Sequence, residues 1–103
     1  ITLMSNPDSR FNANYWLCTI LIDKELTGFD YEELRVALDT KGIETRPLWK
    51  PMHLQPVFKN NPCYIDGTSE KLFNKGLCIP AGPCVTDEDV AYIVTEIKNC
   101  MKK

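Results

Sequence analysis

The residues best suited to chemistry lie in one segment, 44–58, which holds the only histidine of the chain and one of its two tryptophans. Three prolines, at positions 47, 51 and 56, fix φ and remove backbone donors in the same segment. They exclude a continuous helix or a central strand, so we interpret the segment as a ligand-binding loop. Its candidate substrate-binding side chains are Arg46, Trp49, His53 and Gln55.

Two of these side chains could hold an anion. The planar guanidinium of Arg46 suits two-pronged binding of a carboxylate or a phosphate, and we favour that role over a salt bridge to Glu44 or to an acid on a helix. The imidazole of His53 could be a functional ligand-binding group or a structural hydrogen-bonding residue, and the sequence leaves both open. Trp49 is predicted to be a core or cleft-wall residue rather than a stacking platform. Gln55 could contact a sugar or base or cap a turn.

The bulk composition excludes several classes of protein. The chain has 103 residues, enough for one domain, and 12 basic against 14 acidic residues give a net charge of −2. No basic stripe is present, so a nucleic-acid surface is not expected. The longest apolar run, 15–22, is too short to cross a membrane, which takes about 20 residues, and no signal peptide is recognisable.

The five cysteines cannot all pair within one chain, and no Cys-x-x-Cys motif occurs. We therefore expect reduced, mostly buried thiols in a cytoplasmic protein, and no metal site. The chain begins at Ile1 rather than Met, which we interpret as the start of a domain cut from a longer protein.

Local signals predict a short series of helices and strands. An apolar run over 15–22, including Tyr15 and Trp16, predicts a central strand covered on both faces. Asp30 and Glu33 form a capping box for a helix that stops at Gly42. Two further strands are predicted over 43–46 and 77–79. A helix over 68–74 is predicted to be capped by Thr68. A last helix is predicted to be capped by Thr86 and to carry one apolar stripe at positions 90, 93, 94, 97 and 101. Lys98, Lys102 and Lys103 would complement the negative end of that last helix.

These elements predict an α+β fold, a two-layer sandwich in which helices pack on a small, mainly antiparallel sheet of about three strands. Residues 1–14 are polar and carry no periodicity, so we expect an irregular lead-in there.

Three ordered blocks of sequence resemble the C-terminal portion of the DegT/DnrJ/EryC1/StrS sugar aminotransferases. The blocks are Asn14-Tyr15-Trp16, the run from Gly42 to Trp49 with Pro51 to Pro56, and the stretch from Ser69 through Gly76–Gly82 to Thr86. The resemblance covers nearly the whole chain. It implies that residues 1–103 form the small C-terminal domain of a fold-type I aminotransferase, and that 1–14 lead in from a large domain missing from this chain.

The resemblance also implies that the large domain and this chain have different roles in the enzyme. The large domain would hold pyridoxal phosphate on a lysine, so this chain would contain no catalytic, cofactor-binding or metal-binding residue and would be inactive alone. The 44–58 loop would border the active site and help to hold a nucleotide-diphosphate sugar, while glutamate would be the expected amino donor. Arg46 would bind either the diphosphate or the donor carboxylate. The parent enzyme would be a homodimer.

Two other interpretations remain open on the sequence alone. The chain could be a free-standing α+β module that binds a small anion, or a regulatory module, with its site at the Arg46–His53 loop. It could also be a secreted domain stabilised by disulfides, which a count of free thiols would test.

Overall fold

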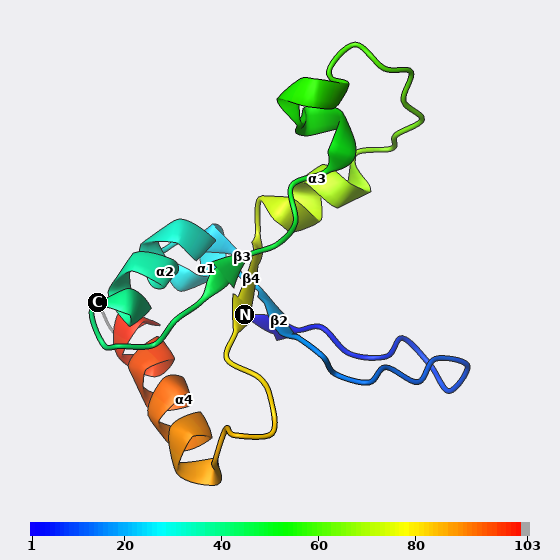
Figure 1. Cartoon of the computed structure of the whole chain (residues 1–103). Coiled ribbons are helices and arrows are strands. Elements are labelled where there is room, and N and C mark those ends of the chain that lie inside the picture. The colour runs from blue at the N-terminus through cyan, green and yellow to red at the C-terminus, as the bar shows by residue number, and fades with distance from the viewer. Residues whose placement is uncertain (102–103) are drawn as a thin grey trace.

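The computed structural model of the chain, which describes residues 1–101, is built on a four-stranded sheet (Figure 1). All three pairs of neighbouring strands are antiparallel, and their order across the sheet is β1-β2-β4-β3. The strands are β1 (Thr2–Leu3), β2 (Cys18–Leu21), β3 (Arg46–Pro47) and β4 (Gly76–Ile79). The α-helices are α1 (Lys24–Thr27), α2 (Tyr31–Asp39), α3 (Thr68–Phe73) and α4 (Asp87–Met101), and two short 3₁₀ turns are η1 (Met52–Leu54) and η2 (Pro56–Phe58).

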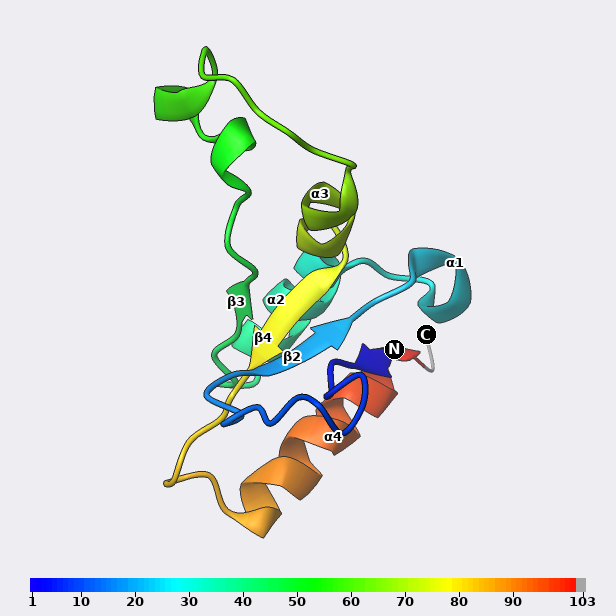
Figure 2. The same cartoon turned by 90° about the vertical axis from the view of Figure 1, so that its right-hand side faces the viewer.

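Helices α2 and α4 lie on the same face of the sheet (Figures 1 and 2). Between these two layers lies one apolar core, to which β2, α2, β4 and α4 all contribute. Its buried side chains are Ile20, Ile22, Phe29, Leu34, Leu38, Ile43, Leu77 and Ile93. The predicted α+β two-layer architecture with an antiparallel sheet is confirmed.

The start of α2 follows the predicted capping box in full. The carboxylate of Asp30 accepts hydrogen bonds from the backbone N–H groups of Glu32 and Glu33, and the Glu33 carboxylate accepts from the backbone N–H of Asp30. These bonds satisfy donors that the first turn of a helix leaves without partners. Gly42, with φ at 72°, turns the chain after the helix, as the sequence predicted.

Helix α4 begins at the predicted cap, but its apolar stripe is only partly buried. The hydroxyl of Thr86 accepts from the backbone N–H of Asp89. Of the stripe, Ile93 is buried and Ile97 packs against the core, whereas positions 90, 94 and 101 are exposed. A 15-residue helix is about 22 Å long, but the four-residue strands span only about 13 Å, so its ends extend past the sheet. The predicted contributions of Lys102 and Lys103 lie outside the described residues.

The N-terminal lead-in is not wholly irregular, which corrects the prediction for 1–14. Residues 2–3 form β1, which pairs with Ile20 and Leu21 of β2 and brings the sheet to four strands. The central strand is also shorter than predicted. Tyr15 and Trp16 precede β2 and are exposed, so their predicted place in the strand core is wrong.

Three other boundaries differ from the predictions. Strand β3 covers residues 46–47 rather than 43–46, and it includes Pro47, which an edge strand tolerates because no ladder hydrogen bond is needed on its outer side. Thr68 is the first residue of α3 rather than its cap, and its backbone N–H donates to Asp66. Helix α1, which the sequence analysis missed, is capped by Asp23.

Two segments project from this sandwich. Residues 48–75, called the arm below, carry η1, η2 and α3 away from one end of the sheet, and the β1–β2 connection extends from another side (Figures 1 and 2). The radius of gyration is accordingly 15.4 Å, against about 13 Å for a compact domain of this length.

All five cysteines are free thiols in the structure, but they are less buried than predicted. Cys78 is buried, whereas Cys63 and Cys84 are exposed because both lie in connections outside the sandwich. Within residues 1–101, no helix has the length and apolar character needed to cross a membrane. The same residues hold no group of three or more His, Cys, Asp or Glu side chains placed to bind a metal ion.

Candidate functional site

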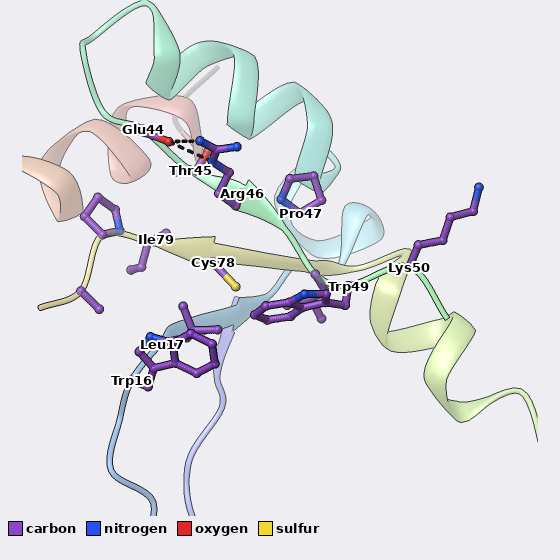
Figure 3. Close-up of a pocket in the computed structure, with 13 residues that line it drawn as sticks. Trp16, Leu17, Glu44, Thr45, Arg46, Pro47, Trp49, Lys50, Cys78 and Ile79 are labelled. Carbon is purple, nitrogen blue, oxygen red and sulfur yellow. Dashed lines mark hydrogen bonds and ion pairs between the residues drawn. The ribbon is translucent and has the colours of Figure 1, made fainter. Parts of the chain in front are cut away.

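A cleft of about 760 Å³ lies on the face of the sheet opposite α2 and α4. Three segments far apart in the sequence line it, namely 16–17 before β2, 44–50 around β3, and 78–81 at the end of β4 (Figure 3). Its volume falls in the range of about 300–1,000 Å³ that is typical of small-molecule sites, and its lining is mainly apolar with charged groups at the edge.

Two tryptophans form one wall of the cleft. The ring centroids of Trp16 and Trp49 are 6.0 Å apart, and the ring planes are tilted by 42°. This separation is within the range of about 4.5–7 Å for interacting aromatic pairs. Both indoles remain largely exposed, at 72% and 69%, so each keeps a free face toward solvent.

An uncommon backbone turn precedes Trp16. Tyr15 has φ at 50°, and it is the one non-glycine residue with positive φ in the described chain. The side-chain oxygen of Asn14 accepts a hydrogen bond of 3.1 Å from the backbone N–H of Trp16, which closes the turn. For a bulky L-residue this conformation costs about 1–3 kcal/mol, which surrounding contacts must offset.

Arg46 lies at the edge of the cleft, paired with Glu44. Its Nε and Nη2 groups both donate to one carboxylate oxygen of Glu44, at 2.8 and 2.5 Å (Figure 3). Both side chains are more than 70% exposed, and an ion pair in such a position contributes about 1 kcal/mol or less. The second Glu44 oxygen makes no bond to Arg46. The guanidinium therefore does not bind this carboxylate in the bidentate geometry that uses both oxygens.

Arg46, Cys78 and Thr19 lie in register on β3, β4 and β2, and the first two line the cleft. The hydroxyl of Thr19 and the thiol of Cys78 are 3.6 Å apart. Cys78 is buried, and on the same strand pair burial raises the pKa of the Cys18 thiol, with Cys78 adding to the effect. A raised pKa disfavours the reactive thiolate, so the Cys18 thiol is not set up for nucleophilic chemistry.

The structure places His53 and Gln55 in the arm, outside the residues that line the cleft. The His53 Nε2 lies 3.6 Å from a carboxylate oxygen of Glu70 on α3, and it is a buried atom without a hydrogen-bond partner within residues 1–101. The Gln55 amide donates to the backbone oxygen of Lys50, at 3.0 Å. Of the four predicted binding residues, the fold therefore brings Arg46 and Trp49 together in the cleft, while His53 and Gln55 make contacts within the arm.

The comparisons with known proteins give one family. The sequence profile of the DegT/DnrJ/EryC1/StrS aminotransferase family matches residues 1–98. The chain belongs to this family.

Three curated relatives of the DegT/DnrJ/EryC1/StrS chain illustrate the match. EpsN of Bacillus subtilis strain 168, provisionally named a pyridoxal phosphate-dependent aminotransferase, is 34% identical over 80% of this chain and 21% of its own length. The GDP-perosamine synthase of Escherichia coli O157:H7 is 35% identical over 81% of this chain and 22% of its own. That of Vibrio cholerae is 30% identical over 84% and 23%. The chain thus spans about a fifth of the length of these relatives.

Solved structures support the fold of this family member. The aminotransferase TlmJ from Streptoalloteichus hindustanus matches with a TM-score of 0.80 at 17% identity, over 98% of this chain and 26% of its own. DesI, solved in the presence of its TDP-sugar product, matches with a TM-score of 0.81 at 21% identity over the same shares.

The described residues do not fit a resident pyridoxal phosphate site, although the family name indicates aminotransferase chemistry. The cofactor needs a lysine held away from water, with a lowered pKa. Every described lysine of this family member is instead exposed. Three of them pair with acids: Asp30 and then Glu33 raise the pKa of Lys24, Lys75 pairs with Asp23 at 3.3 Å, and Lys41 pairs with Glu96 at 3.5 Å. No chemical step is therefore assigned to any lysine within residues 1–101.

Sequence reasoning about this DegT/DnrJ/EryC1/StrS chain missed the place of Trp16 in the site. An aromatic residue at the start of an apolar run is typical of a strand core. This pattern predicts a buried Trp16, whereas the side chain is exposed. The available signal was the preceding Asn14, because Asn before a turn often accepts a bond from a backbone N–H two residues on.

Proposed function

We propose that this chain is the C-terminal small domain of a pyridoxal phosphate-dependent aminotransferase that aminates a nucleotide-linked keto-sugar. The similarity to two GDP-perosamine synthases, at 35% and 30% identity, carries the proposal, because those names denote enzymes that make a nucleotide-linked amino sugar. The fold shared with DesI, whose structure was solved in the presence of a TDP-sugar product, is in line with it.

In this proposal the cofactor lies in a part of the protein outside this chain. The exposed lysines described above argue that residues 1–101 do not hold it, and the relatives are about four times as long as the chain. An amino acid, with glutamate as our expected donor, would supply the nitrogen. The chain alone would be inactive. We further propose that the whole enzyme is a cytoplasmic homodimer.

The role proposed for the chain is to bind and orient the sugar nucleotide. Arg46 would leave Glu44 and bind an anionic group, either the diphosphate or the carboxylate of the amino donor, and Trp49 would form the cleft wall. The roles of His53 and Gln55 as substrate ligands stay predictions. A diphosphate oxygen would give the buried His53 Nε2 the hydrogen-bond partner that it lacks in the described chain.

An amino-transfer assay tests this proposal. The protein produced from its complete coding sequence would be incubated with pyridoxal phosphate, glutamate and keto-sugars linked to GDP, UDP or TDP. Mass spectrometry would detect the sugar amine, and the glutamate-derived keto acid would be measured in parallel. We expect an amino sugar from at least one nucleotide-linked substrate. Amination of none of them, by a protein that is folded and loaded with cofactor, would refute the proposal.

A further inference from the structure

We propose that the two indoles of the cleft form a nucleobase platform, so that the cleft takes the nucleoside diphosphate end of the substrate. The inference rests on the proposed function, which names a nucleotide-linked sugar as the ligand. It goes further by assigning Trp16 to binding and by placing the base on the Trp16–Trp49 wall with the diphosphate at Arg46.

The indole geometry favours a flat ligand. With centroids 6.0 Å apart, the two rings contact each other and leave no room for a base between them. Each ring is nevertheless about 70% exposed, so its outer face is free to stack. A nucleobase stacks on an indole whichever base it is, because every base presents a π face.

The charges at the edge favour an anion beside the base. Arg46 and Lys50 supply two cations, and Glu44 is the one acid among the residues that line the cleft. The pair between Glu44 and Arg46 is exposed and uses one carboxylate oxygen, so a diphosphate can replace the carboxylate at low cost. Lys50, in the same loop, is a second cation among the residues that line the cleft, with its side chain extended away from the indoles (Figure 3).

The turn before Trp16 supports a functional rather than an incidental placement. Tyr15 adopts a left-handed conformation that disfavours a bulky side chain, and the Asn14 bond closes the turn on the backbone of Trp16. Strained residues persist where the surrounding structure requires one conformation, and such places are often ligand sites. Here the strained turn at Tyr15 sets the position of Trp16 next to Trp49.

The test measures binding of GDP and of inorganic pyrophosphate by calorimetry, on the protein from the complete coding sequence. We expect Trp16→Ala and Trp49→Ala to weaken GDP binding about tenfold or more while the affinity for pyrophosphate stays unchanged. Trp16→Phe should restore most of the GDP affinity, because a phenyl ring still stacks. Arg46→Ala should weaken both ligands.

Matched variants separate stacking from packing. Tyr64, the fully exposed tyrosine of the arm, gives the aromatic control, and Tyr64→Ala should bind GDP as the wild type does. Tyr15→Asn, which tolerates positive φ, should keep GDP affinity, whereas the β-branched Tyr15→Val should lose it in part.

The melting temperature of each variant decides between the two roles of the indoles. If Trp16→Ala lowers the melting temperature and leaves the Kd for GDP unchanged, the indoles are a packing surface and the inference is wrong. It is equally overturned if the wild type binds neither GDP nor UDP nor TDP. A protein that binds GDP through the indoles but aminates no sugar would support this inference and refute the proposed function.

Discussion

The side chain of Leu48 lies directly over Gly76, at the point where the arm leaves the sheet and β4 enters it. A Cβ at position 76 would fall 2.9 Å from the backbone oxygen of Leu72 and closer still to the Leu48 side chain. The glycine is thus required by a close approach of two chain segments, since its own φ is not among the positive values. This contact joins both ends of the arm to the sandwich.

We therefore expect Gly76→Ala to destabilise the fold by about 1–3 kcal/mol, the usual cost of overpacking. The measurement is denaturant unfolding. Because the Leu48 side chain can give way but the Leu72 carbonyl cannot, Leu48→Ala should recover part of the loss in the double variant. Strictly additive effects of the two substitutions would show that Leu48 does not occupy this space.

Low pH should reduce the stability of the fold by protonating the Asp30 carboxylate at the start of α2. The backbone N–H of Glu33 and then the ammonium of Lys24 lower the pKa of Asp30. Since the folded-state pKa lies below the unfolded one, this carboxylate stabilises the fold above the unfolded pKa, and the stabilisation is lost as pH falls through the folded pKa. For a carboxyl group the loss occurs below about pH 4.

The Asp30→Asn variant isolates this effect, because asparagine still caps a helix but does not titrate. We expect its melting temperature to fall less than that of the wild type between about pH 6 and about pH 3. The difference will be small, because the groups are exposed and solvent screens them. Identical pH profiles for the two proteins would contradict the assignment.

How far the sequence predicted the structure depends on the range of the interactions. The capping residues Asp30 and Thr86 were identified correctly because each acts on a backbone group three residues away. Strand β1 was missed because two residues become a strand only through pairing with Ile20 and Leu21, which no local pattern records. Its residues carry no periodicity of their own.

The residues of the candidate site were likewise predicted where the signal is local and missed where it is not. Arg46 and Trp49 were found because their loop is dense in proline and functional side chains. Trp16 was assigned to the core because its exposure depends on the left-handed turn at Tyr15 and on a partner indole distant in the sequence. The one local signal is Asn14, which is typical of a turn but does not indicate that Tyr15 takes the positive φ.

A variant of His53 tests whether the part of the arm beyond the cleft contacts the substrate. We expect His53→Ala to raise the KM for the sugar nucleotide more than it lowers stability, because the buried Nε2 is left for a ligand oxygen. The control is Glu70→Ala, which removes the neighbouring carboxylate at 3.6 Å without removing the donor. Equal losses of melting temperature in the two variants, with KM unchanged in both, would make His53 a structural contact of the arm.

Arg46→Ala should raise the KM of the substrate that the guanidinium binds and leave the fold intact, since its partner Glu44 is exposed. Both KM values, for the sugar nucleotide and for the amino donor, must be measured, because either the diphosphate or the carboxylate is a suitable anion. An increase of about tenfold or more in one of them is expected for a lost charge-assisted bond. If neither changes, Arg46 is only the partner of Glu44.

The location of the cofactor is the most direct test of the central claim that this chain shapes a substrate cleft while another part of the protein holds pyridoxal phosphate. The protein from the complete coding sequence would be loaded with cofactor, reduced with borohydride, digested and analysed by mass spectrometry. The account predicts that the reduced cofactor is attached to a lysine outside residues 1–103. Attachment to any lysine within them would contradict it.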